Sequence, residues 1–248
     1  NAPSLTLQKS VIIDNGGTAT ASDWTLTANG PTGFSGAGPS VSNGASFDAG
    51  TYDLSETGGP AGYAASAWVC VGGTQVDADT VTIALGQTAT CTITNNDNPT
   101  TLTLVKTVVN NHGGTNVIAD WSLTADGNPF TSGVSQNVTP GTYTLAESGP
   151  SGYTASAWVC VGGTQAGSDI TLAQGESATC TITNDDNAAS LTLVKQVTNN
   201  NGGTNVAGDW TLTADGTPFT SGVSQNVSAG TYTLAESGPS GYTASAWV

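Results

Sequence analysis

The sequence has few charged residues, and almost none of them is basic. Only 8% of the 248 residues are charged, against roughly 25% in ordinary globular chains. The chain holds 3 basic and 18 acidic residues, so its formal net charge is −15. Binding to nucleic acid or to an anionic membrane requires clustered lysine and arginine. The composition therefore excludes both as partners, and we interpret the acidity as a source of solubility.

Long apolar runs and helical periodicity are also missing. No stretch approaches the roughly 20 apolar residues of a membrane-spanning helix. Glycine, threonine, serine, asparagine and alanine are abundant instead, a mixture that favours strands and tight turns. We therefore predict an all-β chain. The sequence begins at Asn1 without a signal-like segment, so we expect an interior piece of a longer secreted precursor.

Cysteine is scarce, and its 4 copies form two evenly spaced pairs. This pattern indicates an oxidising compartment outside the cell. We predict the disulfides Cys70–Cys91 and Cys160–Cys180, each closing a short loop. A metal site is the competing interpretation, but the spacing is not Cys-x-x-Cys and His112 is the only histidine. We expect neither a metal nor a cofactor.

Internal repetition is the strongest feature that the sequence does contain. The segment LTLQK at 5–9 returns as LTLVK at 102–106 and again at 191–195. Likewise, ASAWVCVGGTQ at 65–75 returns at 155–165. The unit is about 90 residues long, and turn residues separate short alternating segments about every ten positions. This spacing predicts an immunoglobulin-like β-sandwich of around seven strands per unit.

The repeats define three predicted domains: repeat 1 at 1–98, repeat 2 at 99–187 and repeat 3 at 188–248. We interpret NNDNPTT (95–101) and NDDNAAS (184–190) as polar linkers between them. Extra residues in repeat 1 fall around GPTGFSGAGPS (30–40), which reads as a surface loop. Repeat 3 stops before its final strands. We expect that the native chain continues or that a neighbouring subunit supplies them.

All three lysines occupy one repeat position, in the first predicted strand. Side chains alternate between the faces of a strand, so Leu5, Leu7 and Lys9 share the apolar face. The same alternation places a glutamate and an asparagine on inward positions elsewhere in the unit. These residues are Lys9, Lys106 and Lys195; Glu56, Glu147 and Glu236; and Asn95 and Asn184. An unpaired buried ammonium is very costly, so each lysine must be paired, neutral or consumed chemically.

The run YDLSETGGPAGY at 52–63 resembles a known family signature, Tyr-x-Leu-x-Glu followed by Pro-x-Gly-Tyr. It is typical of collagen-adhesin (Cna) B-type domains, the prealbumin-like modules of Gram-positive surface proteins and pili. In that family a first-strand lysine joins a last-strand asparagine in a spontaneous isopeptide bond, and the signature glutamate assists. The runs at 143–153 and 232–242 match with one residue fewer between Glu and Pro.

The resemblance implies roles for particular residues of this chain. In repeat 1 it implies a bond between Lys9 and Asn95, assisted by Glu56. In repeat 2 the corresponding residues are Lys106, Asn184 and Glu147, and in repeat 3 they are Lys195 and Glu236 without an asparagine partner. Desolvation favours a neutral amine beside a neutral carboxyl, which would permit this chemistry. The alternative is a buried ion pair that helps to specify the fold.

Other recurring features have simpler explanations. We assign the repeated tryptophans to core packing rather than to a sugar-binding platform; they are Trp24, Trp121 and Trp210, and Trp68, Trp158 and Trp247. We expect His112 to be a solvated loop residue. Calcium binding by NNDN and NDDN is the weaker interpretation, because the supporting glutamates are not evident. Asn137 and Asn226 begin glycosylation sequons, relevant only in a host that uses them.

Together these features predict a non-enzymatic structural repeat region of an extracellular, bacterial cell-surface stalk, adhesin or fibre. Its expected partners are its own neighbouring repeats and other copies in a fibre, and any ligand is unknown. A catalytic Ser–His–Asp set is not possible with one histidine that the other repeats lack. Two alternatives stay open: a self-assembling filament subunit, and repeats that themselves bind a glycan or protein.

Overall fold

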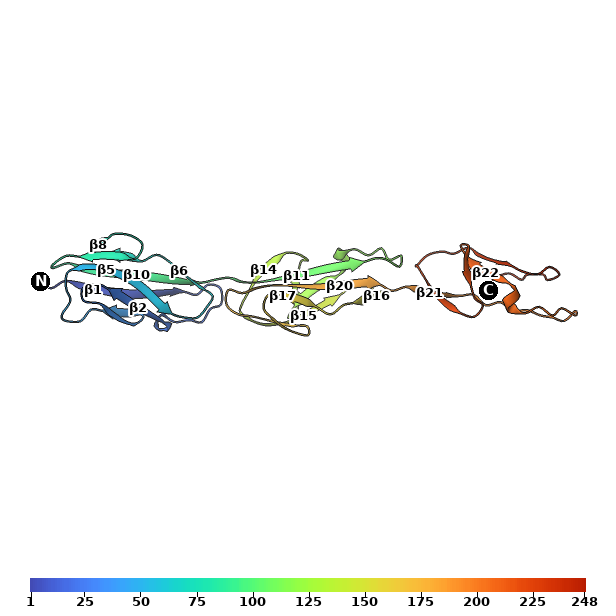
Figure 1. Ribbon diagram of the computed structural model, residues 1–248, viewed down its shortest axis with the longest axis horizontal. Coiled ribbons are helices and arrows are strands. Elements are labelled where there is room, and N and C mark those ends of the chain that lie inside the picture. The colour runs from blue at the N-terminus through green and yellow to red at the C-terminus, as the bar shows by residue number, and fades with distance from the viewer. The chain divides into compact units, whose positions relative to one another are not determined.

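A computed structural model describes all 248 residues, and nearly all of its regular structure is β-strand (Figure 1). The only helices are three single turns, η1 (Ala21–Asp23), η2 (Ile118–Asp120) and η3 (Ala207–Asp209). The all-β prediction is confirmed. None of these helices is long and apolar enough to cross a membrane.

Repeat 1 is a sandwich of two five-stranded sheets. One sheet has the order β4-β1-β10-β6, with β7 also paired to β10, and the other has the order β3-β2-β5-β9-β8. The strands β1 and β10 are parallel, whereas the other pairs are antiparallel. The bounds are β1 (Ser4–Ile12), β2 (Trp24–Asn29), β3 (Phe34–Ala37), β4 (Ser40–Ser42), β5 (Gly50–Gly58), β6 (Tyr63–Ala65), β7 (Val69–Val71), β8 (Thr74–Gln75), β9 (Thr80–Ile83) and β10 (Thr88–Asp97).

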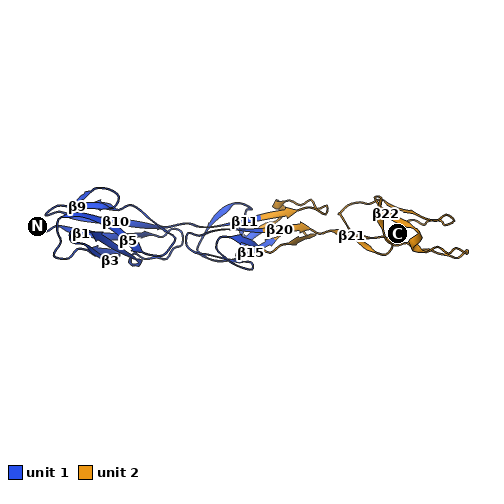
Figure 2. Ribbon diagram, in the orientation of Figure 1, with its two compact units in different colours: residues 1–105, 123–147, 158–181 blue, residues 106–122, 148–157, 182–248 orange.

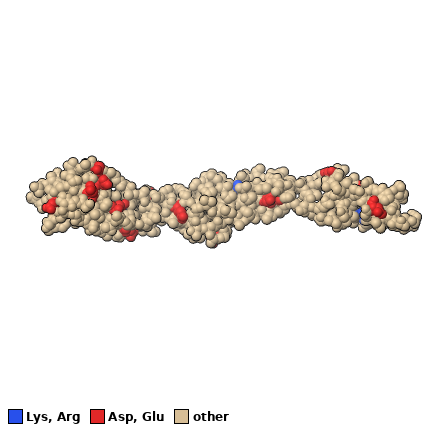
Figure 3. Space-filling view, in the orientation of Figure 1, with Lys and Arg blue, Asp and Glu red and all other residues tan.

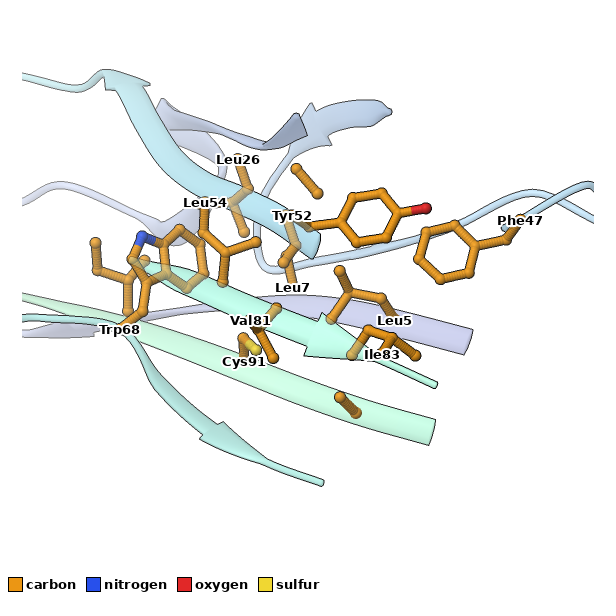
Figure 4. Packing of buried hydrophobic residues seen from close by; sticks show 13 residues of the cluster. Leu5, Leu7, Leu26, Phe47, Tyr52, Leu54, Trp68, Val81, Ile83 and Cys91 are labelled. Atoms are coloured by element: carbon orange, nitrogen blue, oxygen red, sulfur yellow. The ribbon is translucent and has the colours of Figure 1, made fainter. Parts of the chain in front are cut away.

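The core of repeat 1 follows from the alternation of its strands (Figure 4). Leu5 and Leu7 of β1 are fully buried, as are Tyr52 of β5 and Cys91 of β10. The Tyr52 ring stacks on Phe47 with 4.7 Å between ring centroids. Each apolar side chain contributes about 1.5–3 kcal/mol when it is removed from water. The register of every strand is therefore set by which of its faces is apolar.

Repeat 2 has the same element order as repeat 1. Its sheets are β14-β11-β20-β16, with β17 paired to β20, and β13-β12-β15-β19-β18. The bounds are β11 (Thr100–Val109), β12 (Ser122–Ala125), β13 (Asn128–Phe130), β14 (Ser135–Val138), β15 (Gly141–Ser148), β16 (Tyr153–Ala155), β17 (Val159–Val161), β18 (Thr164–Ala166), β19 (Asp169–Leu172) and β20 (Ser177–Asp186).

Repeat 3 contains fewer strands. The pair β21-β24 and the three-stranded sheet β23-β22-β25 enclose a small core around Leu193, Leu212 and Phe219. The bounds are β21 (Ala189–Thr192), β22 (Thr211–Ala214), β23 (Thr217–Phe219), β24 (Ser224–Val227) and β25 (Leu234–Ser237).

By the density of its contacts, the chain divides into two compact units (Figure 2). The first unit comprises residues 1–105, 123–147 and 158–181 and so includes all of repeat 1. The second comprises residues 106–122, 148–157 and 182–248 and includes all of repeat 3.

Three expectations from the sequence need correction. Each complete repeat has ten short strands rather than around seven. Part of the expected loop at 30–40 is the strand β3, which pairs with β2. The expected linkers are mostly strand, because β10 continues to Asp97 and β20 to Asp186. Asn95, Asp97 and Asp186 are buried although they are polar, so only residues 98–99 and 187–188 lie between the strands of successive repeats.

One disulfide lies within each complete repeat. Cys70 bonds Cys91 directly across the β7–β10 pair, and Cys160 bonds Cys180 across the β17–β20 pair. The bonded residues are 21 and 20 positions apart. Each bond therefore fixes the last strand of its repeat to an edge strand.

Removing the repeat 1 disulfide should destabilise that repeat alone. Closing a loop of this length is worth about 3 kcal/mol. We expect the double variant Cys70→Ala, Cys91→Ala to lower one calorimetric unfolding transition by about 10–20 °C. The matched variant Cys160→Ala, Cys180→Ala should lower a different transition. Free thiols at these positions in a non-reducing peptide map of the unmodified chain would contradict the assignment.

Candidate functional site

Repeat 1 buries a lysine inside its sandwich. Lys9 follows Leu5 and Leu7 on the inward face of β1, and its side chain is fully buried. On the face drawn in Figure 3, scattered acidic side chains and very little lysine are visible, as expected for a chain with 3 basic residues of which Lys9 is buried. An ammonium group in this position has lost its hydration and needs compensation from the protein.

The opposite sheet supplies that compensation. Glu56 of β5 lies with its Oε2 2.6 Å from Lys9 Nζ, and its side chain is 12% exposed. Trp24 of β2 presents its ring face to the same amine, with Nζ 4.6 Å from the ring centroid. The edge of Tyr63 packs on this indole, with centroids 5.4 Å apart. The amine is thus held between a carboxylate and an aromatic face that excludes water.

Asn95 lies on the strand next to the lysine. The parallel register of β1 and β10 places Lys9 opposite Ile93 and Val11 opposite Asn95. Lys9 and Asn95 are therefore diagonal neighbours two positions apart, and both side chains are buried on the inward face. Neighbouring strands lie about 4.8 Å apart and two residues span about 6.6 Å, so the diagonal separation of about 8 Å is within reach of a lysine side chain. The Asn95 side-chain oxygen is buried without a hydrogen-bond partner.

The surroundings of Lys9 make its amine easier to deprotonate than an ordinary lysine. Burial lowers the pKa of the Lys9 amine from its usual value, and the nearby Glu56 carboxylate only partly opposes this shift. A depressed pKa increases the fraction of free amine, which is the nucleophilic form of a lysine.

Repeat 2 contains the same set of residues. Lys106 of β11 is 2% exposed, and its Nζ lies 4.9 Å from the ring centroid of Trp121. Asn184 of β20 is buried, and its side-chain oxygen has no hydrogen-bond partner. Glu147 stands on β15 at the position that Glu56 occupies on β5.

Repeat 3 contains the pair in a more open setting. Lys195 Nζ lies 2.7 Å from Glu236 Oε2, with the side chains 14% and 21% exposed. The same amine is 4.8 Å from the ring centroid of Trp210. The structure therefore brings a lysine, an aromatic ring and a glutamate together in repeats 1 and 3.

Sequence reasoning missed the part that tryptophan has in this site. The prediction of core packing holds for Trp68 and Trp158, which are 3% and 7% exposed, and is wrong for Trp247, which is 40% exposed. It is incomplete for Trp24 and its counterparts, which also cover the lysine amines. The sequence did contain a signal, because each repeat has one Asp-Trp pair and one lysine at fixed positions.

A second buried charge, also missed from the sequence, ends the last strand. Asp97 is 1% exposed and accepts hydrogen bonds from the backbone N–H groups of Asp14, Asn15 and Gly17 at 2.8–2.9 Å. Burial by itself would raise the pKa of Asp97, but these donors outweigh it and hold the pKa at about 2. Gly17 is required because a Cβ there would collide with the Tyr63 hydroxyl.

Asp186 ends β20 in the same way. It accepts hydrogen bonds from the backbone N–H groups of Asn111, His112 and Gly114. His112 is 41% exposed and its Nδ1 lies 2.9 Å from the Asp186 carbonyl oxygen, so it is only partly a solvated residue. Together with Asp185, these two residues form a group of potential metal ligands, whose ligand atoms lie within 4.8 Å of one another. We assign no metal site here, because the Asp186 oxygens are already used by the backbone.

The geometry defines a class of protein: tandem β-sandwiches in which each of the two complete repeats has a buried lysine on the strand next to its last strand. A prealbumin-like fold domain family matches residues 1–93, 97–182 and 186–248. The chain therefore belongs to this family, in three consecutive copies. The resemblance to the prealbumin-like modules known as collagen-adhesin B-type domains is confirmed.

Several solved structures are similar to the chain. The Bacillus anthracis TIE protein matches with 16% identity and a TM-score of 0.50, over 97% of this chain and 46% of its own. The chain thus spans less than half the length of that protein. The pilus adhesin SpaC from Lactobacillus rhamnosus GG matches with 16% identity and a TM-score of 0.27, over 98% and 37% of the two chains. The major pilin from Streptococcus pyogenes matches with 14% identity and a TM-score of 0.37, over 75% and 99%. No curated protein matches the chain.

The Asp97 cluster makes stability depend on acid. Its folded pKa of about 2 is below the ordinary 3.8, so the cluster stabilises fully above the ordinary pKa and is lost as pH falls through about 2. We expect the unfolding temperature of repeat 1 to fall between about pH 4 and pH 2. Asp97→Asn should lower this temperature at neutral pH and flatten its acid dependence.

The exposed strand residue Asp53 provides the control for this measurement. Asp53→Asn should leave the acid dependence of repeat 1 unchanged in calorimetric scans over the same pH range. Equal pH dependence in the Asp97→Asn variant and the unmodified chain would refute the assignment.

Proposed function

We propose that this chain is a covalently tied spacer region of an extracellular bacterial surface stalk or fibre. In each complete repeat an isopeptide bond joins the first strand to the last, between Lys9 and Asn95 and between Lys106 and Asn184. Our domain boundaries at 98/99 and 187/188 separate successive tied units. The observation that carries the proposal is the buried Lys9 amine, paired with Glu56 and diagonal to Asn95 on a parallel strand.

The bond forms by transfer of the asparagine side-chain acyl group to the lysine. Glu56 takes a proton from the Lys9 ammonium, and the neutral amine attacks the side-chain carbonyl carbon of Asn95. A new C–N bond forms and the bond to the amide nitrogen breaks. Glu56 relays a proton from the attacking amine to the leaving nitrogen, so ammonia leaves and Glu56 keeps the proton that it first took from the ammonium. Trp24 keeps water from the reacting atoms. The reaction occurs once within one molecule, so the chain turns over no substrate.

The unpartnered Asn95 oxygen fits this scheme. A buried carbonyl without a hydrogen bond costs about 1–3 kcal/mol. In the bonded product a protonated Glu56 would donate to this oxygen and remove the cost. The same argument applies to Asn184, whose side-chain oxygen is also buried without a partner.

Such a bond would give each repeat mechanical resistance. Force applied along the chain enters a repeat through β1 and leaves through β10, which are adjacent and parallel. Without a covalent link, this load is borne by backbone hydrogen bonds and side-chain packing. A covalent link between these two strands would bear the load in place of those hydrogen bonds and contacts. By loop-closure arithmetic, it would also add on the order of 4–5 kcal/mol to the stability of the repeat.

Intact mass tests the proposal directly. Each bond expels one ammonia, so the mass should fall short of the sequence value by about 17 Da per complete repeat, beyond the hydrogens lost in the disulfides. Glu56→Ala should restore the mass of repeat 1 only and lower its unfolding temperature. Tandem mass spectrometry should find Lys9 and Asn95 in one branched peptide of the unmodified chain.

Glu176 offers a matched control, because it is the one glutamate outside the repeated position and accepts a hydrogen bond from its own loop. Glu176→Ala should leave both mass deficits in place. If the unmodified chain shows no deficit beyond its disulfides, the lysines are only ion-paired and the proposal is wrong.

A further inference from the structure

Repeat 1 has one sheet face on which no charged side chain points outward. It is the outward face of β4, β1, β10 and β7, which we call the hydroxyl face. Its outward positions hold serine, threonine, glutamine and valine and, toward one end, isoleucine and asparagine. The outward face of the other sheet carries Asp53. Because the chain has a net charge of −15, a second copy meets less repulsion at the hydroxyl face than at an acidic one.

Repeat 2 has the same face on β14, β11, β20 and β17. In repeat 1, one row across the face consists of Val71, Thr90, Thr6 and Ser42. The equivalent positions of repeat 2 hold Val161, Thr179, Thr103 and Ser135. The residue types of this row are therefore identical in the two repeats. Asp185, at the end of β20, is the only charged residue at an outward position of the repeat 2 face.

The β7 end of the face exposes valine. Val69 and Val71 are 62% and 76% exposed, and the equivalent Val159 and Val161 are 63% and 77% exposed. Each valine of β7 lies directly opposite an outward threonine of β10, so threonine methyl groups extend the apolar strip. Contiguous exposed apolar surface is typical of a contact site, whereas single exposed residues are not. The strip recurs with the repeat and so points to a partner that covers it.

Hydroxyl groups on the face bond to one another. The Oγ atoms of Thr6 and Ser42 lie 3.0 Å apart. In repeat 2, Thr101 Oγ1 donates to Ser177 Oγ at 2.8 Å. A polar group that already has a hydrogen-bond partner loses less when it is removed from water. Burial of this face is therefore less costly than burial of unpaired hydroxyls.

The edges of this sheet are protected against the addition of another strand, so a partner has to approach the face. Gln75 Oε1 accepts a hydrogen bond from the Cys70 N–H at 3.0 Å, and Gln75 Nε2 donates to the Trp68 carbonyl oxygen at 2.8 Å. The glutamine amide thus occupies backbone groups that a neighbouring strand would use. Gln165 makes the same two bonds along β17. At the opposite edge, β4 has only 3 residues.

We propose that the hydroxyl face of each complete repeat is a lateral contact surface for a second copy of this chain. Twisted sheets can pack face to face at about −30°. A sugar-binding platform needs aromatic rings, and these strands have none at their outward positions. The inference rests on the proposed function only in treating the chain as part of a fibre.

The size of the face predicts weak pairing of single repeats. It spans four strands at about 4.8 Å each and about 20 Å along them, or roughly 400 Å². A stable interface buries about 800 Å² per partner. One repeat therefore provides about half of what a stable pair needs, and association requires contacts from several repeats at once.

Sedimentation velocity of the 248-residue chain tests the proposal. We expect the weight-average mass to rise with protein concentration, and more so in 1 M salt, where repulsion between acidic chains is screened within about 3 Å. The double variant Thr92→Asp, Thr181→Asp puts a carboxylate on both faces and should lower the association constant by about tenfold or more. The matched variant Thr82→Asp, Thr171→Asp adds the same charge to the outward face of the other sheet. It should associate like the unmodified chain.

Two further variants separate loss of contact from loss of folding. Val71→Ser, Val161→Ser changes exposed side chains, so it should weaken association several-fold without changing the calorimetric unfolding temperatures. Thr92→Asp alone should have an intermediate effect, because the repeat 2 face remains. Unchanged association in the valine variant, or equal loss in the two aspartate double variants, would overturn the proposal.

A chain that stays monomeric at every concentration and salt would also overturn it, as would a monomeric chain that binds an immobilised neutral polysaccharide through this face. The mass deficits expected for the isopeptide bonds are measured separately. Association without a mass deficit would support the contact surface and contradict the isopeptide chemistry. A mass deficit without association would do the reverse.

Discussion

The burial of one lysine amine in a small apolar sandwich is the constraint on which the rest of each repeat depends. An ammonium deprived of water is unstable unless the protein replaces its hydration. Glu56 and the face of Trp24 do so in repeat 1, and each comes from the sheet opposite the lysine. The two sheets must therefore pack in one relative register. A hydrophobic residue in place of Lys9 would tolerate sliding, but a paired charge does not.

The inward site could be predicted from the sequence because strand side chains alternate strictly. Once Leu5 and Leu7 were assigned to the core, Lys9 had to follow them, and the structure places it there. The same rule placed Glu56 beside Tyr52 and Leu54, and Asn95 beside Cys91 and Ile93. Periodicity gives the face of a residue but not its neighbours across the sandwich. That the lysine strand runs parallel to the asparagine strand became evident only from the topology.

The features that sequence reasoning missed depend on backbone geometry in three dimensions. Asp97 was assigned to a linker because it lies in a polar, asparagine-rich run. Its burial depends on the N–H groups of a distant turn, at Asp14, Asn15 and Gly17, converging on one carboxylate. No local pattern around Asp97 reports that convergence. The Gly16–Gly17 pair, which permits this arrangement, could be seen in the sequence. Glycine pairs also mark ordinary turns, so the pair alone did not indicate a buried carboxylate.

The last strand of repeat 1 connects these separate observations. Along its inward face, Cys91 is bonded to β7, Asn95 lies beside the lysine of β1, and Asp97 holds the turn that follows β1. Three of the four inward positions from Cys91 to Asp97 thus attach one strand to three parts of the fold. A strand held only by backbone hydrogen bonds could slip by two residues and keep its apolar face inward. Each of these attachments is specific to one register, so together they select one pairing of the first and last strands. In this arrangement the asparagine is already in place before any covalent chemistry begins.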